Sequence, residues 1–137
     1  SAGVDMLPGA VERLKAEAVQ LRSELLRARR DGALTAVASL PAGPVMRADF
    51  AGLGVEALRE AANLAVERGA AALMASLEED GYLVAFARPE TMPADMAGLM
   101  RECGVKGGGR PDFAQGRAAD LSALDRAEAL LRERYHP

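Results

Sequence analysis

A short stretch of the chain, residues 106–116, combines the residue types that bind phosphate groups and nucleobases. It reads Lys106-Gly107-Gly108-Gly109-Arg110-Pro111-Asp112-Phe113-Ala114-Gln115-Gly116. Consecutive glycines can turn their backbone N–H groups toward one point and so form an anion-binding concavity. Lys106 and Arg110 would add positive charge at its rim, Phe113 a ring for base stacking, and Gln115 a donor and an acceptor. Together these groups suit a sugar-phosphate chain with an unstacked base. The alternative is a tight glycine-rich turn with solvated flanks.

The order of residues in this stretch resembles the K-G-G-G-R-P-D-x-A-Q-G motif of the DHH-associated (DHHA) domain. That domain closes the chains of alanyl-tRNA synthetases and of the longer stand-alone alanyl-tRNA editing proteins, and it is similar to the C-terminal half of DHH phosphoesterases. Every fixed position matches as far as Gly116, but Arg117, Ala118 and Ala119 replace the glycines that follow in the family. The resemblance implies a tRNA-binding domain, with tRNA-Ala as the expected partner. The expected nucleic-acid-binding residues are Lys106, Gly107, Gly108, Gly109, Arg110, Phe113, Gln115 and Arg117.

The overall charge allows only a local footprint for nucleic acid. The formal net charge is −3 over 137 residues, which argues against a protein coated with RNA or DNA. Between residues 101 and 117, four cations and two acids give a local balance of +2. This is a modest electrostatic footprint. The six residues are Arg101, Lys106, Arg110, Arg117, Glu102 and Asp112.

The single cysteine and the lack of long apolar runs indicate where in the cell the protein is expected. Cys103 cannot form an intrachain disulfide, which fits a reducing compartment. No apolar run approaches the roughly 20 residues of a membrane span, and no signal peptide is visible. We therefore expect a cytoplasmic location and no membrane partner. Because the chain begins with Ser1 and not with Met, we also expect it to be a piece of a longer protein.

Apolar residues near the N-terminus repeat with the spacing of a coiled-coil seam. Their alternating steps of four and three residues correspond to a and d positions. In a parallel pair, Glu17 would face Arg22 of the partner subunit, and Glu24 would face Arg29 of the partner subunit. An antiparallel pair would set basic e positions against each other, so we expect a parallel homodimer if the helix pairs with itself. The alternative is an amphipathic helix that lies on its own domain or on an upstream one. The seam consists of Leu7, Val11, Leu14, Ala18, Leu21, Leu25 and Ala28.

Turn-forming residues divide this helical stalk from the rest of the chain. Asp31-Gly32 is expected to break or bend the stalk helix, and residues 33–40 then form a short helix or a strand. The prolines of segment 41–44 stop that element. The expected domains are a stalk and dimerisation region over 1–40 and a globular DHHA domain over 44–137.

The remaining pattern predicts an α/β domain with a small mixed sheet packed with helices. Asp80-Gly81 is a strong hairpin signal between two apolar strands. The strand that precedes them is expected to run parallel to one of them, through a crossover helix. The glycine stretch is expected as a loop. The expected elements are a strand over 45–50, a helix over 55–68, strands over 71–77 and 82–88, and helices over 94–103 and 121–135, the last capped by Asp120.

The chain lacks the side chains that the related enzymes use for chemistry. According to the resemblance, alanyl-tRNA editing needs a zinc site of three histidines and a cysteine. This chain has one histidine, His136, and one cysteine, whereas zinc sites take three or four protein ligands. It also has no Asp-His-His cluster for a DHH phosphoesterase and no P-loop signature. We therefore expect no catalytic residue, no metal and no cofactor.

Binding is thus the expected function. The first hypothesis is an accessory tRNA-binding and self-association domain of an alanyl-tRNA synthetase or an alanyl-tRNA trans-editing protein, with the catalytic or editing module elsewhere in the parent chain. The second is the substrate-binding half of a DHH-type single-strand phosphoesterase. The third is a pure dimerisation module, which the acidic composition favours.

Overall fold

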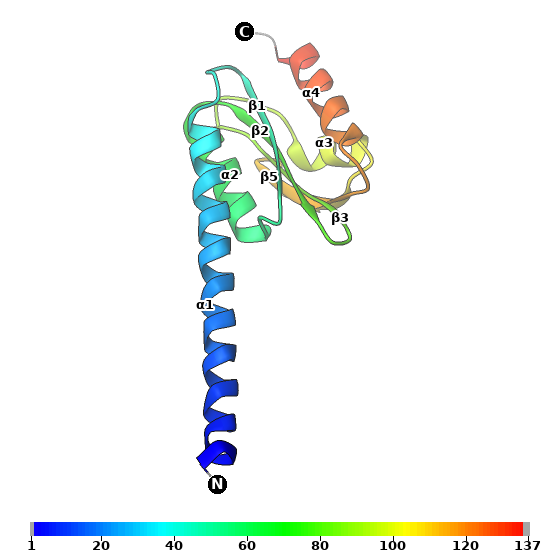
Figure 1. Ribbon diagram of the computed structural model, residues 1–137. Helices are drawn as coiled ribbons and strands as arrows, with labels where there is room; N and C mark the ends of the chain where they lie inside the picture. The colour runs from blue at the N-terminus through cyan, green and yellow to red at the C-terminus, as the bar shows by residue number, and fades with distance from the viewer. Residues whose placement is uncertain (1, 136–137) are drawn as a thin grey trace.

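The computed structural model describes the backbone of residues 2–135 and the side chains of residues 11–135. In this part of the chain, a long helix projects from a small body in which a five-stranded sheet has helices on both faces (Figure 1). The predicted α/β class, a helical stalk followed by a mixed sheet, is confirmed. The elements are α1 (Ala2–Ala38), β1 (Val45–Ala51), α2 (Val55–Glu67), β2 (Ala71–Glu78), β3 (Gly81–Ala87), α3 (Met96–Glu102), β4 (Lys106–Gly109), β5 (Phe113–Ala118) and α4 (Ser122–Arg134).

The sheet has the strand order β1-β2-β3-β5-β4. β1 pairs in parallel with β2, and all other neighbours are antiparallel. The first predicted strand therefore does lie parallel to a strand of the predicted hairpin, with α2 between them in the chain. β1 and β4 form the two edges of the sheet.

Each face of the sheet buries its own apolar cluster. On one face, Ala61, Ala62 and Ala65 of α2 are fully buried in a cluster that also holds Ala85 and Ala87 of β3. Their small side chains let α2 approach the sheet closely. On the other face, α3 and α4 cover a cluster that contains Phe86, Met96, Met100, Leu124 and Leu131. α2 packs on β2 and β3, so β5 and β4 extend the sheet beside it.

The stalk is one uninterrupted helix, so the break predicted at Asp31-Gly32 is wrong. The separate element predicted over 33–40 does not form, because residues 33–38 are the C-terminal end of α1. Ala33 and Val37 are buried against α2 and the sheet. A glycine in a helix costs only about 1 kcal/mol relative to alanine, and this packing outweighs that cost.

Polar contacts also attach α1 to the body. Arg29 donates to the Gly52 carbonyl at 3.2 Å, and Arg30 pairs with Glu60 at 2.5 Å. Arg68 of the α2 end donates to the Val37 carbonyl at 2.7 Å, which caps the end of α1. The stalk and the body are thus joined by packing and by polar contacts.

The glycine stretch is a β-hairpin, so its prediction as a loop is wrong. Lys106 to Gly109 form β4, which pairs antiparallel with β5, and Gly107 lies opposite Gly116. The predicted cup of converging amides is therefore also wrong. The glycines here permit a close approach of two strands, as the distances below demonstrate, and do not curl the backbone.

The two C-terminal helices are shorter than predicted. α3 begins at Met96 and not at residue 94, and α4 begins at Ser122. The N-cap of α4 is Leu121 and not the predicted Asp120. The carboxylate of Asp120 nevertheless accepts a hydrogen bond from the Ser122 N–H at 2.9 Å and so satisfies a donor at the start of α4. Within the described residues, even the 37-residue α1 offers no apolar stretch that could cross a membrane.

Candidate nucleic-acid interface

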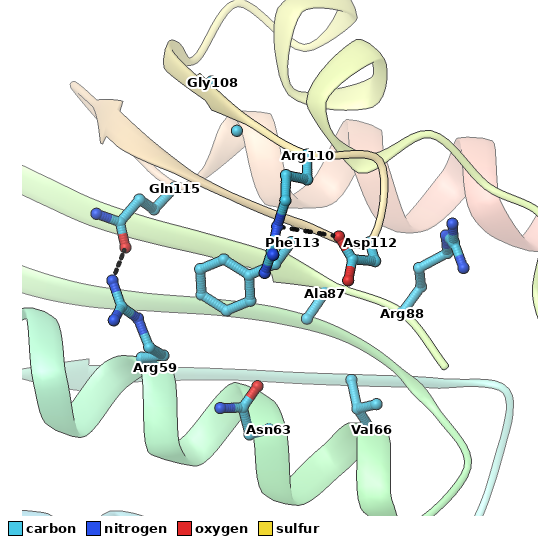
Figure 2. A pocket seen from close by; sticks show the side chains of 11 residues that line it. Arg59, Asn63, Val66, Ala87, Arg88, Gly108, Arg110, Asp112, Phe113 and Gln115 are labelled. Carbon is cyan, nitrogen blue, oxygen red and sulfur yellow. Dashed lines mark hydrogen bonds and ion pairs between the residues drawn. The ribbon is translucent and has the colours of Figure 1, made fainter. Parts of the chain in front are cut away.

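A cavity of about 510 Å³ lies where the edge of the sheet extends beside α2. Its size falls within the range of ligand-binding clefts, about 300–1,000 Å³. Arg59, Asn63 and Val66 reach it from α2, and the opposite wall comes from β4, β5 and the segment after β3 (Figure 2). The lining residues are Arg59, Asn63, Val66, Ala87, Arg88, Gly108, Gly109, Arg110, Asp112, Phe113 and Gln115.

An arginine and an aromatic ring face each other in this cavity. The guanidinium carbon of Arg59 lies 5.7 Å from the centre of the Phe113 ring, within the distance of a cation–π contact. Arg59 also donates to Oε1 of Gln115 at 3.5 Å, so a helix side chain bridges to β5 (Figure 2). Phe113 is only partly buried. Its ring therefore forms an accessible platform with a cation beside it.

Two further arginines add charge to the lining of the cavity. Arg110 is 78% exposed and pairs with Asp112 at 3.4 Å, a contact that solvent screens strongly. Arg88 is partly buried, and its Nε donates to the Ala94 carbonyl at 2.6 Å. The three arginines outnumber the single acid, so the lining carries a formal charge of +2. Arg88 is held in place by its hydrogen bonds to backbone carbonyls, whereas the exposed side chain of Arg110 is free to move.

The backbone of β4 presents alternate amides to the open edge of the sheet. Arg110 N–H donates to the Phe113 carbonyl at 2.9 Å, which makes these residues a hydrogen-bonded pair. Bonded and non-bonded pairs alternate along an antiparallel ladder, so Gly107 and Gly109 occupy non-bonded positions. Their N–H groups point away from β5, toward the sheet edge, and both residues are exposed.

The three glycines of β4 differ in whether the fold requires glycine at their positions. A Cβ on Gly107 would lie 2.3 Å from the Gln115 carbonyl oxygen, and one on Gly109 would lie 2.5 Å from that of Phe113. A Cβ on Gly108 would meet no atom within 4 Å, and Gly108 does not have a positive φ. The fold therefore needs glycine at positions 107 and 109 but leaves position 108 free, although Gly108 lines the cavity.

The structure brings together five of the eight predicted binding residues: Gly108, Gly109, Arg110, Phe113 and Gln115 all line the cavity. Lys106 and Gly107 belong to the same strand but do not line it. Arg117 lies farther along β5, where it pairs with Asp80 at 2.6 Å. It faces a separate hollow, also lined by Arg29.

Sequence reasoning missed the contribution of α2 and of the segment after β3. Arg59 and Asn63 are four residues apart and so share one helix face, next to the buried alanines. This polar pair at the border of an apolar stripe was the available signal. For Arg88, the sequence showed only that it precedes a proline, which gives no indication of a binding role. Nothing local indicated that all three would face the glycine strand.

The described residues hold no group of three or more His, Cys, Asp or Glu that could bind a metal ion. His136 lies outside the described residues. Cys103 is partly buried at the end of α3, and burial raises the pKa of its thiol. A raised pKa disfavours the thiolate and hence nucleophilic chemistry.

Comparison with solved structures shows a similarity to a domain of alanyl-tRNA synthetase. No family model matches the chain. The structure is similar to the C-Ala domain of alanyl-tRNA synthetase from Aquifex aeolicus, with 25% sequence identity and a TM-score of 0.57. The match covers 65% of this chain and 87% of that domain. The predicted resemblance to the C-terminal region of alanyl-tRNA synthetases is therefore confirmed.

A second similarity concerns the fold alone. RecJ from Thermus thermophilus matches with 14% identity and a TM-score of 0.50. The match covers 93% of this chain but only 20% of RecJ. The fold of this chain thus also occurs as part of a much larger protein.

Proposed function

We propose that this chain is an accessory tRNA-binding domain of an alanyl-tRNA synthetase or an alanyl-tRNA trans-editing protein. The observation that carries the proposal is the cavity beside α2, where three arginines, an accessible phenylalanine ring and a bare glycine strand meet. The similarity to the C-Ala domain supports tRNA as the nucleic acid. We propose tRNA-Ala as the specific partner.

The groups in the cavity suit an RNA segment in which one base has left the stack. Phe113 would stack on that base, and the amides of Asn63 and Gln115 would bond to its polar edge. Arg88 and Arg110 would hold the flanking phosphates. A phosphate at the sheet edge would also accept from the outward N–H groups of β4, which have the geometry of an anion site when charge lies beside them.

Self-association through α1 is the second part of the proposal. The leucines of its projecting half that the structure describes are 45–65% exposed, which is unusual for a stable monomer surface. The chemical step, ligation or deacylation, is assigned to another module of the parent protein, in the cytoplasm. None of the residues that the structure describes is assigned to that step.

Binding measurements with matched arginine variants test the RNA part. tRNA-Ala, a second tRNA and a short single-stranded RNA are titrated at two salt concentrations. Arg59→Ala and Arg110→Ala are each expected to weaken tRNA binding. Removal of one phosphate-binding side chain should lower the salt dependence by about one counterion. Arg132→Ala is the control, because Arg132 lies on α4, outside the cavity, and pairs with Glu128 at 3.0 Å.

The outcomes separate the three hypotheses for this chain. Equal tRNA binding by the parent and both cavity variants would show that this cavity is not the RNA interface, and no tRNA binding by the parent would leave a dimerisation module. Binding of the short single strand as tightly as tRNA would favour the phosphoesterase-type role. A preference for tRNA-Ala that both cavity variants lose is the expected result.

A further inference from the structure

Asp112 is the one acidic residue in the lining of the cavity, where it lies among three arginines. Its side chain is 53% exposed, and solvent screens its ion pair with Arg110. Within the described part of the chain, the carboxylate accepts no hydrogen bond besides this ionic contact. A carboxylate has room for about four hydrogen bonds, so most of its acceptor capacity is open to a ligand. RNA phosphates cannot use that capacity, because they carry the same charge.

Backbone hydrogen bonds fix the turn that presents this carboxylate. The Arg110 N–H donates to the Phe113 carbonyl at 2.9 Å and closes the turn. The Arg88 N–H donates to the Asp112 carbonyl at 3.1 Å and ties the turn to the segment after β3. Pro111 restricts the backbone between them. The acceptor is therefore held in place before a ligand arrives, which lowers the entropic cost of binding.

The stacking ring lies between this acceptor and a donor. Figure 2 shows the Phe113 ring between the side chains of Asp112 and Gln115. Oε1 of Gln115 accepts from Arg59 at 3.5 Å, which leaves the NH₂ group of the same amide as a donor. A base stacked on the ring would thus meet a pure acceptor on one side and a donor on the other.

We propose that the cavity takes a guanine base, whose N1–H and 2-amino groups both donate to the carboxylate of Asp112 and whose O6 accepts from the amide of Gln115. The inference rests on the proposed RNA-binding function and adds the identity of the base. Guanine carries two adjacent donors on its pairing edge. Adenine and cytosine place an acceptor beside their amino group, and uracil has one donor between two acceptors. Among the four common bases, guanine alone matches a carboxylate with two hydrogen bonds.

The charge of Asp112 gives the two possible roles of this residue opposite consequences. A carboxylate near bound phosphates repels them. If Asp112 served only the turn, Asp112→Asn would strengthen the binding of every RNA, guanine-containing RNA included. If Asp112 binds guanine, the same change removes the preference for guanine, because the amide replaces one acceptor by a donor.

Binding of matched RNA hairpins tests the inference with the unaltered chain. The hairpins share one stem and differ in a single bulged nucleotide: guanosine, inosine, adenosine, cytidine or uridine. We expect the guanosine bulge to bind about tenfold more tightly than the adenosine, cytidine and uridine bulges, as a good bidentate contact would give. Inosine keeps N1–H and O6 but lacks the 2-amino group, so its hairpin should bind with intermediate affinity.

Asp112→Asn is the test variant, and Asp49→Asn is its matched control. Asp49 is exposed on β1, outside the cavity, so both changes remove one negative charge. Asp112→Asn is expected to bind all five hairpins with similar affinity, whereas Asp49→Asn should keep the guanosine preference of the parent. Thermal unfolding of both variants verifies that each is folded, and the inosine comparison in the parent does not depend on either of them.

The outcomes separate this inference from the proposed function. Equal binding of the guanosine and adenosine bulges by the parent overturns the inference, and so does a guanosine preference that persists in Asp112→Asn. Binding of tRNA without binding of any hairpin also overturns it. In these three cases, tRNA binding that Arg110→Ala weakens leaves the proposed function in place. A parent chain that does not bind tRNA-Ala overturns the proposed function and this inference together.

Discussion

Gly107 of β4 and Gly116 of β5 approach so closely that a Cβ on Gly107 would lie 2.4 Å from the Cα of Gly116. The two residues form a non-bonded pair of the ladder, the position at which antiparallel strands come closest. The fold alone therefore explains these two glycines of the motif. It does not explain Gly108, whose missing side chain leaves the cavity wall bare.

We expect Gly108→Ala to separate binding from folding. The added methyl meets no atom of the chain, so the free energy of unfolding should stay within about 0.5 kcal/mol of the parent value. Binding of tRNA should weaken, because the methyl enters the cavity. Gly107→Ala is the matched variant and should lose about 1–3 kcal/mol through overpacking. Thermal unfolding and tRNA titration measure both effects, and unchanged binding by Gly108→Ala would show that RNA does not use the bare strand.

Arg117 and Arg110 should differ in their importance for RNA, although the sequence motif groups them. Arg117 pairs with Asp80 and lies outside the cavity, whereas Arg110 lines it. We expect Arg117→Ala to leave tRNA affinity close to that of the parent and Arg110→Ala to reduce both the affinity and its salt dependence, by about one counterion. Titrations at two salt concentrations compare them. A larger loss for Arg117→Ala would place the RNA on the hollow near Arg29 instead.

The parts of this fold that were predictable depend on local pattern. The Asp80-Gly81 turn and the alanine-rich face of α2 each specify an element within a short window, and both were predicted correctly. The helix break predicted at Gly32 was wrong because the burial of Ala33 and Val37, a tertiary effect, outweighs the cost of a glycine in a helix.

Only the part of the candidate site that the glycine motif contributes was predictable from the sequence. Arg110, Phe113 and Gln115 are close in sequence, so their type and spacing were informative. Arg59 and Asn63 enter the site only because α2 packs on β2 and β3 and thereby lies beside β5 and β4. That relation is set by strand order, which no window of sequence contains.

Ser76 is expected to be a stability determinant that also supports the site. It is fully buried, its Oγ accepts from the Leu53 N–H at 3.0 Å, and its hydroxyl donates to Glu78 at 3.2 Å. Glu78 in turn accepts from the Gly54 N–H, at the start of α2. Ser76→Ala leaves a buried donor unsatisfied, so we expect a loss of about 1–3 kcal/mol in the free energy of unfolding.

Denaturant unfolding of Ser76→Ala and Ser39→Ala measures this effect against a surface control. The Ser39 hydroxyl bonds to the Thr35 carbonyl but is exposed, so its removal should change the unfolding free energy by less than about 0.5 kcal/mol. Equal values for the two variants would mean that water replaces the Ser76 hydroxyl.

Cys103 should react with alkylating reagents only slowly at neutral pH. Burial raises the pKa of its thiol, so the thiolate that reacts is scarcer than in an ordinary cysteine with a pKa of about 8.5. The alkylation rate in the folded chain should therefore rise at higher pH than in the chain unfolded by urea. Because the folded state favours the protonated thiol, the contribution of this group to stability is present below the ordinary pKa and is lost as the pH rises toward the folded one. Iodoacetamide labelling followed by mass spectrometry across pH 7–10 gives both profiles, and coincident profiles would show that the thiol is as solvated in the folded chain as in the unfolded one.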